Sequence, residues 1–285
     1  MPLRIFNNLN SSVAQNRLDT NNRNLGESIS RVASGDRLTG AGTSTADKSI
    51  SELLNSDARA LRQSARNLND GISLINVAEG SLNEQASILI RIREVLAQAD
   101  GALSDTVRDT LQLEINTLKD EFNRIANSTE FNGQQLLDGS LAASVEGRQH
   151  VVVVVGIDSS ADGRIDLNEV VDLESTDTTT LGIDDLSVAT FQEAIDGLSK
   201  IDAAQVAISS ARASIGATQN RFARALSNLN VSIENLTAAS SGIKDADFAE
   251  EVTDLTRRQL LVQSASAMVG QANLIPEGVL LLLQQ

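Results

Sequence analysis

A heptad repeat dominates the stretch LNSDARALRQSARNLNDGISLINVAEGSLNEQASILIRIREVL, residues 54–96. Apolar residues recur there at every seventh position: Leu54, Leu61, Leu68, Ile75, Leu82, Leu89 and Leu96. A small or apolar residue follows most of them four positions later, at Ala58, Ala65, Ile72 and Ala86. A repeat sustained over this length is typical of a coiled-coil seam and predicts a helix about 65–70 Å long.

Two further seams lie downstream of the first. A shorter one follows a Gly-containing turn with Ser104 as the expected N-cap, and its members are Leu111, Ile115, Leu118, Phe122 and Ile125. Near the other end of the chain the seven-residue spacing returns at Ile201, Ile208, Ile215, Phe222, Leu229, Leu236 and Ile243. We therefore predict a mainly α fold, a long antiparallel helical coiled-coil bundle formed from both chain ends with a small central β-hairpin region.

The composition argues against several classes of function. The formal net charge of −15 disfavours nucleic acid or an anionic membrane as a partner. There is no cysteine and a single histidine, His150, so we expect no thiol chemistry, no zinc site and no enzyme. No apolar run is long enough to cross a membrane, and the N-terminal MPLRIFNNLNSS lacks the apolar core of a secretory signal. These signals alone would indicate a cytoplasmic protein.

The middle of the chain, residues about 130–190, changes to a β-like pattern. HVVVVVGI and RIDLNEVVDLES are predicted strands, with Asp162-Gly163 as the hairpin turn. The stretch GIDSSADGRIDLNEVV, residues 156–171, has the spacing of a calcium-binding EF-hand loop, with Asp158, Asp162, Asp166 and Glu169 as candidate ligands. An EF-hand needs flanking helices, so a hairpin with no specific metal is favoured. Weak calcium binding by the four carboxylates is the alternative, and no other cofactor is expected.

Both chain ends carry apolar side chains that their own chain cannot easily bury. Residues about 5–35 are rich in Asn and Ser, which are poor helix formers. The last residues form an apolar tail on an acidic protein, which suggests burial against another chain. The predicted subunit-contact residues are Leu3, Ile5, Phe6, Val279, Leu280, Leu281, Leu282 and Leu283.

The chain resembles the bacterial flagellin family over nearly its full length, as a short form lacking large outer domains. The stretches that carry the resemblance are NLNDGISLINVAEGSLNE (67–84), RIANSTEFNGQQLLDG (124–139), IGATQNRF (215–222), DADFAEEVTDLTRRQLLVQSASAMVGQAN (245–273) and the closing PEGVLLLLQQ. The segment ASGDRLTGAGTSTADKSISE (33–52) departs from the usual family pattern while keeping Gly35 and Arg37.

The resemblance implies a structural subunit that polymerises into a helical flagellar filament outside the cell and is exported without a cleaved signal peptide. Residues 1–44 and 245–285 would form inner terminal helices, 45–130 and 190–244 the bundle, and 131–189 the hairpin region. Implied partners are other copies of the chain, the export apparatus and its chaperone, and the hook-associated and cap proteins. A face recognised by an innate-immune receptor would include Arg91, Val95 and Glu114. The alternatives are a hook–filament junction protein and a calcium-dependent binding module.

Overall fold

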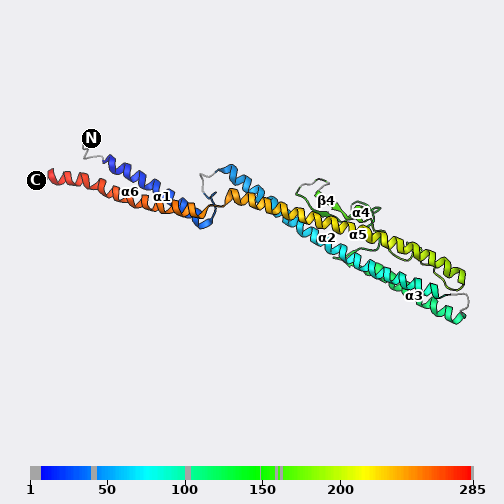
Figure 1. Ribbon diagram of the computed structural model, residues 1–285. Coiled ribbons are helices and arrows are strands. Elements are labelled where there is room, and N and C mark those ends of the chain that lie inside the picture. The colour runs from blue at the N-terminus through cyan, green and yellow to red at the C-terminus, as the bar shows by residue number, and fades with distance from the viewer. Residues whose placement is uncertain are drawn as a thin grey trace. The chain divides into compact units, whose positions relative to one another are not determined.

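The computed structural model describes residues 8–39, 44–99, 104–147, 149–157, 160 and 163–283, with side chains to Leu274. The helices are α1 (Leu9–Ser34), α2 (Thr45–Gln98), α3 (Asp105–Ser128), α4 (Leu167–Val171), α5 (Phe191–Lys244) and α6 (Phe248–Leu283). Four short strands complete the described part: β1 (Glu130–Phe131), β2 (Gln134–Gln135), β3 (Val152–Val154) and β4 (Arg164–Asp166). The predicted mainly α architecture is confirmed (Figure 1). Within the described residues no helix is apolar enough over a sufficient length to cross a membrane.

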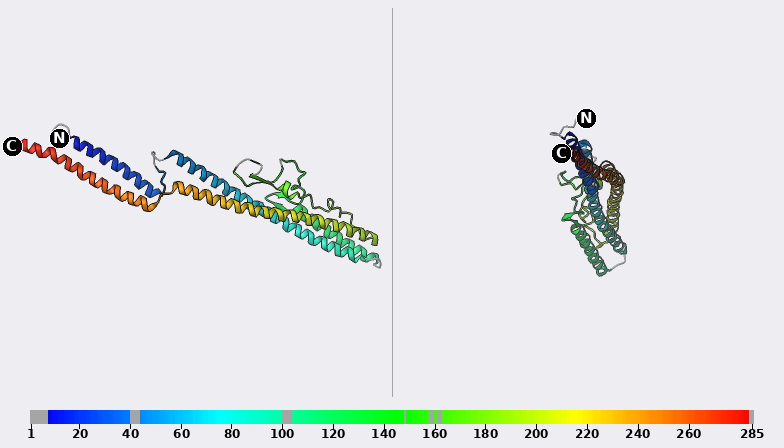
Figure 2. Two further views of the ribbon diagram at one scale, coloured as in Figure 1. Left: turned by 45° about the horizontal axis from the view of Figure 1, so that its top comes forward. Right: turned by 90° about the vertical axis from the view of Figure 1, so that its left-hand side faces the viewer.

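The chain divides into two compact units, Asp57–Glu234 and a second one made of Met1–Ser56 with Asn235–Gln285. The division falls inside α2 and α5, whereas the predicted boundaries at 44/45 and 244/245 lie near the ends of these helices. In the 57–234 unit, α2, α3 and α5 pack side by side, and the residues between α3 and α5 lie against them (Figures 1 and 2).

The heptad seams form the core of the 57–234 unit. Leu61, Leu68, Ile75, Leu82, Leu89 and Leu96 on α2 are buried, and so are Ile201, Ile208, Ile215, Phe222 and Leu229 on α5. In the predicted second line of the α2 seam Ala58 is buried, whereas Ala65, Ile72 and Ala86 are only half-buried. The buried line runs three positions after each leucine or isoleucine instead, through Ser64, Gly71, Ala78, Gln85 and Ile92. On a helix, the positions three and four residues after each leucine or isoleucine both lie near the same face. The seven-residue spacing alone therefore does not show which of the two positions is buried.

Gly71 on α2 marks a close approach of three elements. A Cβ added there would lie 2.9 Å from Phe222 Cε2 on α5 and 3.1 Å from Val153 Cγ2 on β3. Real Cβ atoms do not tolerate the first distance, so the absence of a side chain lets α5 and β3 pack against α2. Two heptads further along the buried line, Gln85 donates from Nε2 to the carbonyls of Phe122 (3.4 Å) and Thr176 (3.3 Å), which ties α2 to α3 and to the loop before α5.

The central region forms two hairpins and a short helix. β1 pairs with β2 across Asn132-Gly133, both with positive φ as a type I′ turn requires. β3 pairs antiparallel with β4, so the predicted hairpin is present, but Val154 pairs with Arg164 and the connection is much longer than a two-residue turn at Asp162-Gly163. The predicted second strand is also too long. It ends at Asp166, whose side chain accepts from Asn168 N and caps α4.

Candidate assembly interface

The α1–α6 pair belongs to the other unit, and polar contacts link its two helices along their length. The helices run antiparallel: Asn8 Nδ2 donates to the Ala272 carbonyl (2.8 Å) at one end, and Arg31 pairs with Glu251 (3.0 Å) at the other. Between them, Arg258 donates to the Asn24 carbonyl (2.6 Å). Figure 1 and the left-hand view of Figure 2 show the two helices lying side by side. Polar side chains therefore fix the register of this pair.

The pair has almost no buried core of its own. Among its described side chains only Ser28 is fully buried, and its Oγ has no hydrogen-bond partner in the described part of the chain. Large apolar side chains instead face outward: Leu9, Val13 and Ile29 on α1, and Phe248, Val252, Leu260, Leu261, Met268 and Leu274 on α6. Leu9 is 73% exposed and Met268 is 64% exposed. A soluble monomer rarely leaves this much apolar surface in water without a use for it.

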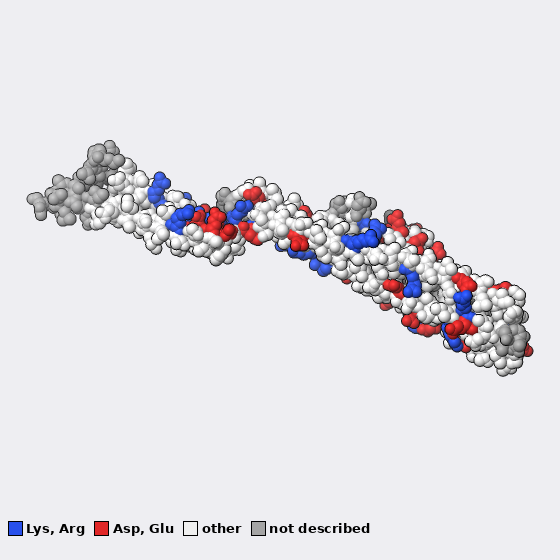
Figure 3. Space-filling view, viewed as in Figure 1, with Lys and Arg blue, Asp and Glu red and all other residues white. Residues whose placement is uncertain are grey.

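The surface of the pair is also uncharged toward its termini. No Asp, Glu, Lys or Arg occurs from residue 259 to residue 276, in a chain whose net charge is −15. Figure 3 shows the corresponding white surface next to the undescribed terminal residues. A groove of about 500 Å³ lies between α1 and α6 in this part, lined by Asn10, Val13, Ala14, Arg17, Ala265, Met268, Gln271 and Ala272. Such a surface fits protein–protein contact, because Arg17 is the only charged residue in this lining.

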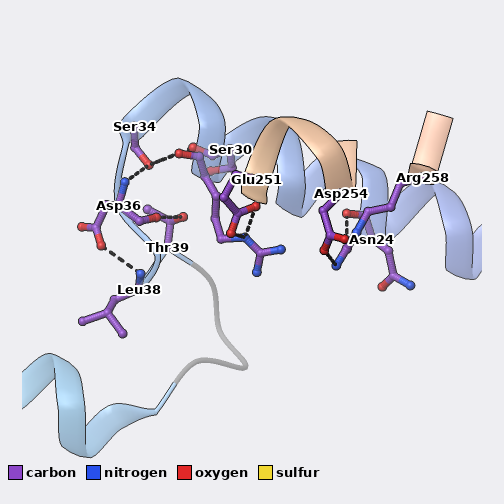
Figure 4. A network of polar contacts seen from close by, with 10 residues as sticks. Asn24, Ser30, Ser34, Asp36, Leu38, Thr39, Glu251, Asp254 and Arg258 are labelled. Atoms are coloured by element: carbon purple, nitrogen blue, oxygen red, sulfur yellow. Dashed lines mark hydrogen bonds and ion pairs between the residues drawn. The ribbon is translucent and has the colours of Figure 1, made fainter. Parts of the chain in front are cut away.

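A polar network closes the other end of the pair (Figure 4). Gly35 adopts the left-handed conformation (φ 68°) that ends α1, and its N–H donates to the Arg31 carbonyl (2.8 Å). Just beyond it, Asp36 accepts from the Leu38 N–H (2.8 Å) and lies 3.6 Å from Lys244 Nζ. On α6, Asp254 pairs with Arg258 across one turn. The network thus joins the end of α1 to the start of α6.

None of the predicted subunit-contact residues has a described side chain. Leu3, Ile5 and Phe6 fall outside the described residues. The backbone of Val279 and of Leu280, Leu281, Leu282 and Leu283 lies in the last turns of α6, but their side chains are not described. These contacts therefore stay predictions. The sequence analysis did not identify the exposed apolar residues in the middle of α6, such as Leu260 and Met268. The absence of charged residues from 259 to 276 could have indicated them.

Two of the three residues predicted for a receptor face lie at the surface. Arg91 on α2 donates to Glu114 on α3 (2.6 Å) and to Glu94 (3.0 Å), and these hydrogen bonds raise the pKa of the Arg91 guanidinium. Val95 is 0% exposed and packs in the core, so it cannot contribute to an exposed face of this protomer. Recognition through Arg91 and Glu114 stays a prediction.

The acidic loop is only partly described. Asp158 and Asp162 lie outside the described residues, whereas Asp166 ends β4 and Glu169 is exposed in the first turn of α4. Among the described residues no group of His, Cys, Asp and Glu could hold a metal ion.

His150 is engaged by two acceptors beside this loop. Its Nδ1 lies 2.6 Å from Asp166 Oδ2, and its Nε2 lies 2.9 Å from the Val145 carbonyl oxygen. Both contacts raise the pKa of His150, the one with Asp166 most. His150 therefore links the end of β4 to the segment around Val145.

Two family models match the chain. The bacterial flagellin N-terminal helical region matches residues 5–142, and the bacterial flagellin C-terminal helical region matches residues 198–283. The chain belongs to the bacterial flagellin family. It is 37% identical over 282 residues to a flagellar filament 30.7 kDa core protein of Treponema maltophilum, covering 98% of this chain and 99% of that protein. It is 35% identical over 304 residues to the flagellin of Bacillus subtilis, covering 99% and 100%.

A solved structure shares the fold of this flagellin-family chain. A protein described as flagellar hook-associated, from Vibrio parahaemolyticus, superimposes with a TM-score of 0.58 and covers 71% of this chain and 100% of that one. Its sequence identity is 19%, so the likeness concerns the fold alone. The family models and the two relatives confirm the resemblance deduced from the sequence at the level of the family.

Proposed function

We propose that the chain is the structural subunit of a helical flagellar filament and that the α1–α6 pair carries much of the contact between subunits. One observation carries this proposal: the pair exposes uncharged, apolar helix faces while burying only one of its described side chains, Ser28. In the 57–234 unit the seams are already buried, so that unit does not need a partner for its core. Burying the faces of the pair between subunits would supply the stability that the isolated pair lacks.

The surface of the pair favours a growing fibre over a closed dimer. The groove between α1 and α6 and the outward residues nearer the start of α6, such as Val252 and Leu260, are different patches. A contact that joins one patch to a different patch of the next copy is heterologous, and it propagates into a helix unless its rotation closes a ring.

Substituting the outward residues tests this assignment. Leu260→Gln and Met268→Gln keep helix-compatible side chains but place an amide on the apolar face, so seeded polymerisation of the purified protein should be strongly reduced. Gln263→Ala, at an exposed polar position of the same helix, is the matched control and should polymerise like the wild type. Sedimentation and electron microscopy measure the outcome. Normal filaments from the double variant would contradict the proposed role of the pair.

Removing residues 276–285 tests the contribution of the terminal apolar tail. We expect a soluble helical monomer that does not form filaments, because the tail includes the predicted contact residues Val279 and Leu280–Leu283. Circular dichroism would show that the helices remain. Filaments of normal appearance from the truncated chain would rule out the tail as an essential contact.

The proposed function places the subunit outside the cell, in the flagellar filament. Export through the flagellar apparatus with a chaperone, without a cleaved signal peptide, and contact with hook-associated and cap proteins are further parts of the proposal. The flagellin models at both ends of the chain favour a filament subunit over a hook–filament junction protein. Copy number separates the two: thousands of copies per filament are expected, against roughly one ring of a junction protein. The family is a structural one, and no enzymatic role is proposed.

A second candidate function is weak calcium binding by the loop 158–169. The observation that favours it is α4, which begins directly after Asp166, as a helix follows the loop in EF-hand sites. Asp166 already contacts His150, so calcium would have to displace that contact and we expect a Kd of about 10⁻⁴–10⁻³ M. Calorimetry with calcium should detect binding to the wild type and less to Glu169→Gln. No heat of binding at millimolar calcium would refute this function.

A further inference from the structure

The join between α5 and α6 is not explained by its own sequence. Gly242 weakens the last turn of α5, but the residues across the join, IKDADF from Ile243 to Phe248, include no proline or glycine that would end the helix there. Nevertheless α5 ends at Lys244 and α6 begins at Phe248. The cause has to be sought in contacts with other parts of the chain.

Residues 35–37 take the hydrogen bonds that would otherwise continue the helix. In a continuous helix the carbonyls of Ile243 and Lys244 would accept from the N–H groups four residues later. Here Arg37 Nε donates to the Ile243 carbonyl (2.9 Å), and the Arg37 N–H donates to the Lys244 carbonyl (2.9 Å). In return, the Ala246 N–H donates to the Gly35 carbonyl (3.0 Å) rather than to a carbonyl one turn back in α5.

Neighbouring contacts hold this arrangement in place. Asp36 and Asp245 form an isolated antiparallel bridge, and Leu38 is 8% exposed, which anchors the segment after Arg37. On the far side of the join, Asp247 Oδ1 accepts from the Ala249 N–H (2.9 Å), as an N-cap of the new helix does. Figure 4 shows Asp36 and Leu38 in the turn after α1, beside the start of α6.

We propose that residues 35–37 form a clasp that fixes where α6 begins, and that Arg37 is a positioning residue for filament assembly. The start of α6 decides which of its residues meet α1, as Glu251 meets Arg31, and which face outward, as Val252 does. A shift of one residue would rotate the helix by about 100° and turn the apolar face away from its present direction. The clasp thus selects the surface offered to the next subunit, an inference that rests on the proposed function.

The test compares Arg37→Ala and Arg37→Lys with the exposed control Arg257→Ala. On the monomer, amide exchange at Ala246 should rise about 2- to 10-fold in Arg37→Ala, in line with the loss of one hydrogen bond. In Arg37→Lys it should stay nearer the wild type, because an ammonium can also donate to a helix C-terminal carbonyl. Arg257→Ala, which loses only a contact with Asp254 within its own helix, should leave exchange at Ala246 unchanged.

Assembly of the same variants is the second readout. Arg37→Ala should raise the protein concentration needed for seeded growth or change the helical shape of the filaments, with recovery in Arg37→Lys. Unchanged exchange in Arg37→Ala would overturn the clasp. Faster exchange with filaments identical to wild type would overturn the positioning role. A wild-type protein that fails to polymerise would instead refute the proposed function, because the exchange measurement uses the monomer.

Discussion

Replacing Gly71 by alanine should destabilise the 57–234 unit although alanine is the better helix former. The added Cβ would lie 2.9 Å from Phe222 Cε2 and 3.1 Å from Val153 Cγ2. Helix propensity favours alanine over glycine by about 1 kcal/mol, whereas an extra carbon in a packed core costs about 1–3 kcal/mol. Phe222 is 0% exposed and has little room to move, so we expect the packing cost to prevail by about 1 kcal/mol.

Gly80→Ala provides the matched control for this substitution. Gly80 lies on the same helix, is exposed, and an added Cβ there would meet no described atom within 4 Å. It should gain stability by about 0.5–1 kcal/mol, so the difference between the two variants isolates the close contact. A unit of this size shifts its Tm by about 2–4 °C per kcal/mol. Thermal unfolding of the monomer, followed by circular dichroism, would measure it.

A double substitution identifies the clashing atoms. In the Phe222→Leu background the ring carbon nearest to Gly71 is gone, so Gly71→Ala should cost less there than in the wild type. The reasoning would be refuted if Gly71→Ala stabilised the protein as much as Gly80→Ala does. A cost that is the same with and without the Phe222 ring would likewise contradict the proposed contact.

Three further substitutions test other features of the structure. Ser28→Ala should stabilise α1 by about 1 kcal/mol in thermal unfolding, because the wild-type hydroxyl is buried without a described partner, and a loss of stability would contradict this. Gly139→Ala should cost about 1–3 kcal/mol in urea unfolding, since φ is 93° and the added Cβ would lie 3.2 Å from Ser175 N. The contact with Asp166 raises the pKa of His150 in the folded state. The stabilisation that protonated His150 gives the folded state is therefore complete below the pKa of the unfolded state, and it is lost as the pH rises through the folded-state pKa. In calcium-free buffer, amide protection near His150 should therefore fall above about pH 6.5, and His150→Gln should remove that dependence.

The helical framework could be predicted from the sequence because its signal is periodic and long. Each seam repeats a choice between apolar and polar residues many times, so single exceptions such as Gln85 do not obscure it. The sequence did not show which residues form the second buried line of the α2 seam. Ala65 and Ser64 both lie near the apolar face of α2, and packing against the partner helices decides which of them is buried. Gly71 shows the same limit: its role depends on Phe222, which lies far away in the sequence.

The central region was harder to predict because its segments are short. Ile165, Leu167 and Val171 fit an alternating strand, but the last two are four residues apart and equally fit one face of a helix. The Asp166 side chain decides in favour of the helix by capping it. The Arg37 clasp has no local signal at all, since its partners lie more than 200 residues away and are backbone carbonyls that any residue could supply.

The two units of this chain differ in how they obtain their stability, and this difference follows from their sequences. The 57–234 unit contains the leucine and isoleucine seams and buries them within one chain. The α1–α6 pair leaves its less exposed apolar residues, such as Leu18, Leu25 and Leu255, only half-buried, and other large apolar side chains lie outside. Two helices joined by half-buried apolar residues and a few polar contacts are marginal in water, because each surface ion pair contributes only about 0–1 kcal/mol. The pair therefore has the most to gain from a second copy, and a substitution such as Leu260→Gln should weaken polymerisation far more than it lowers the Tm of the monomer.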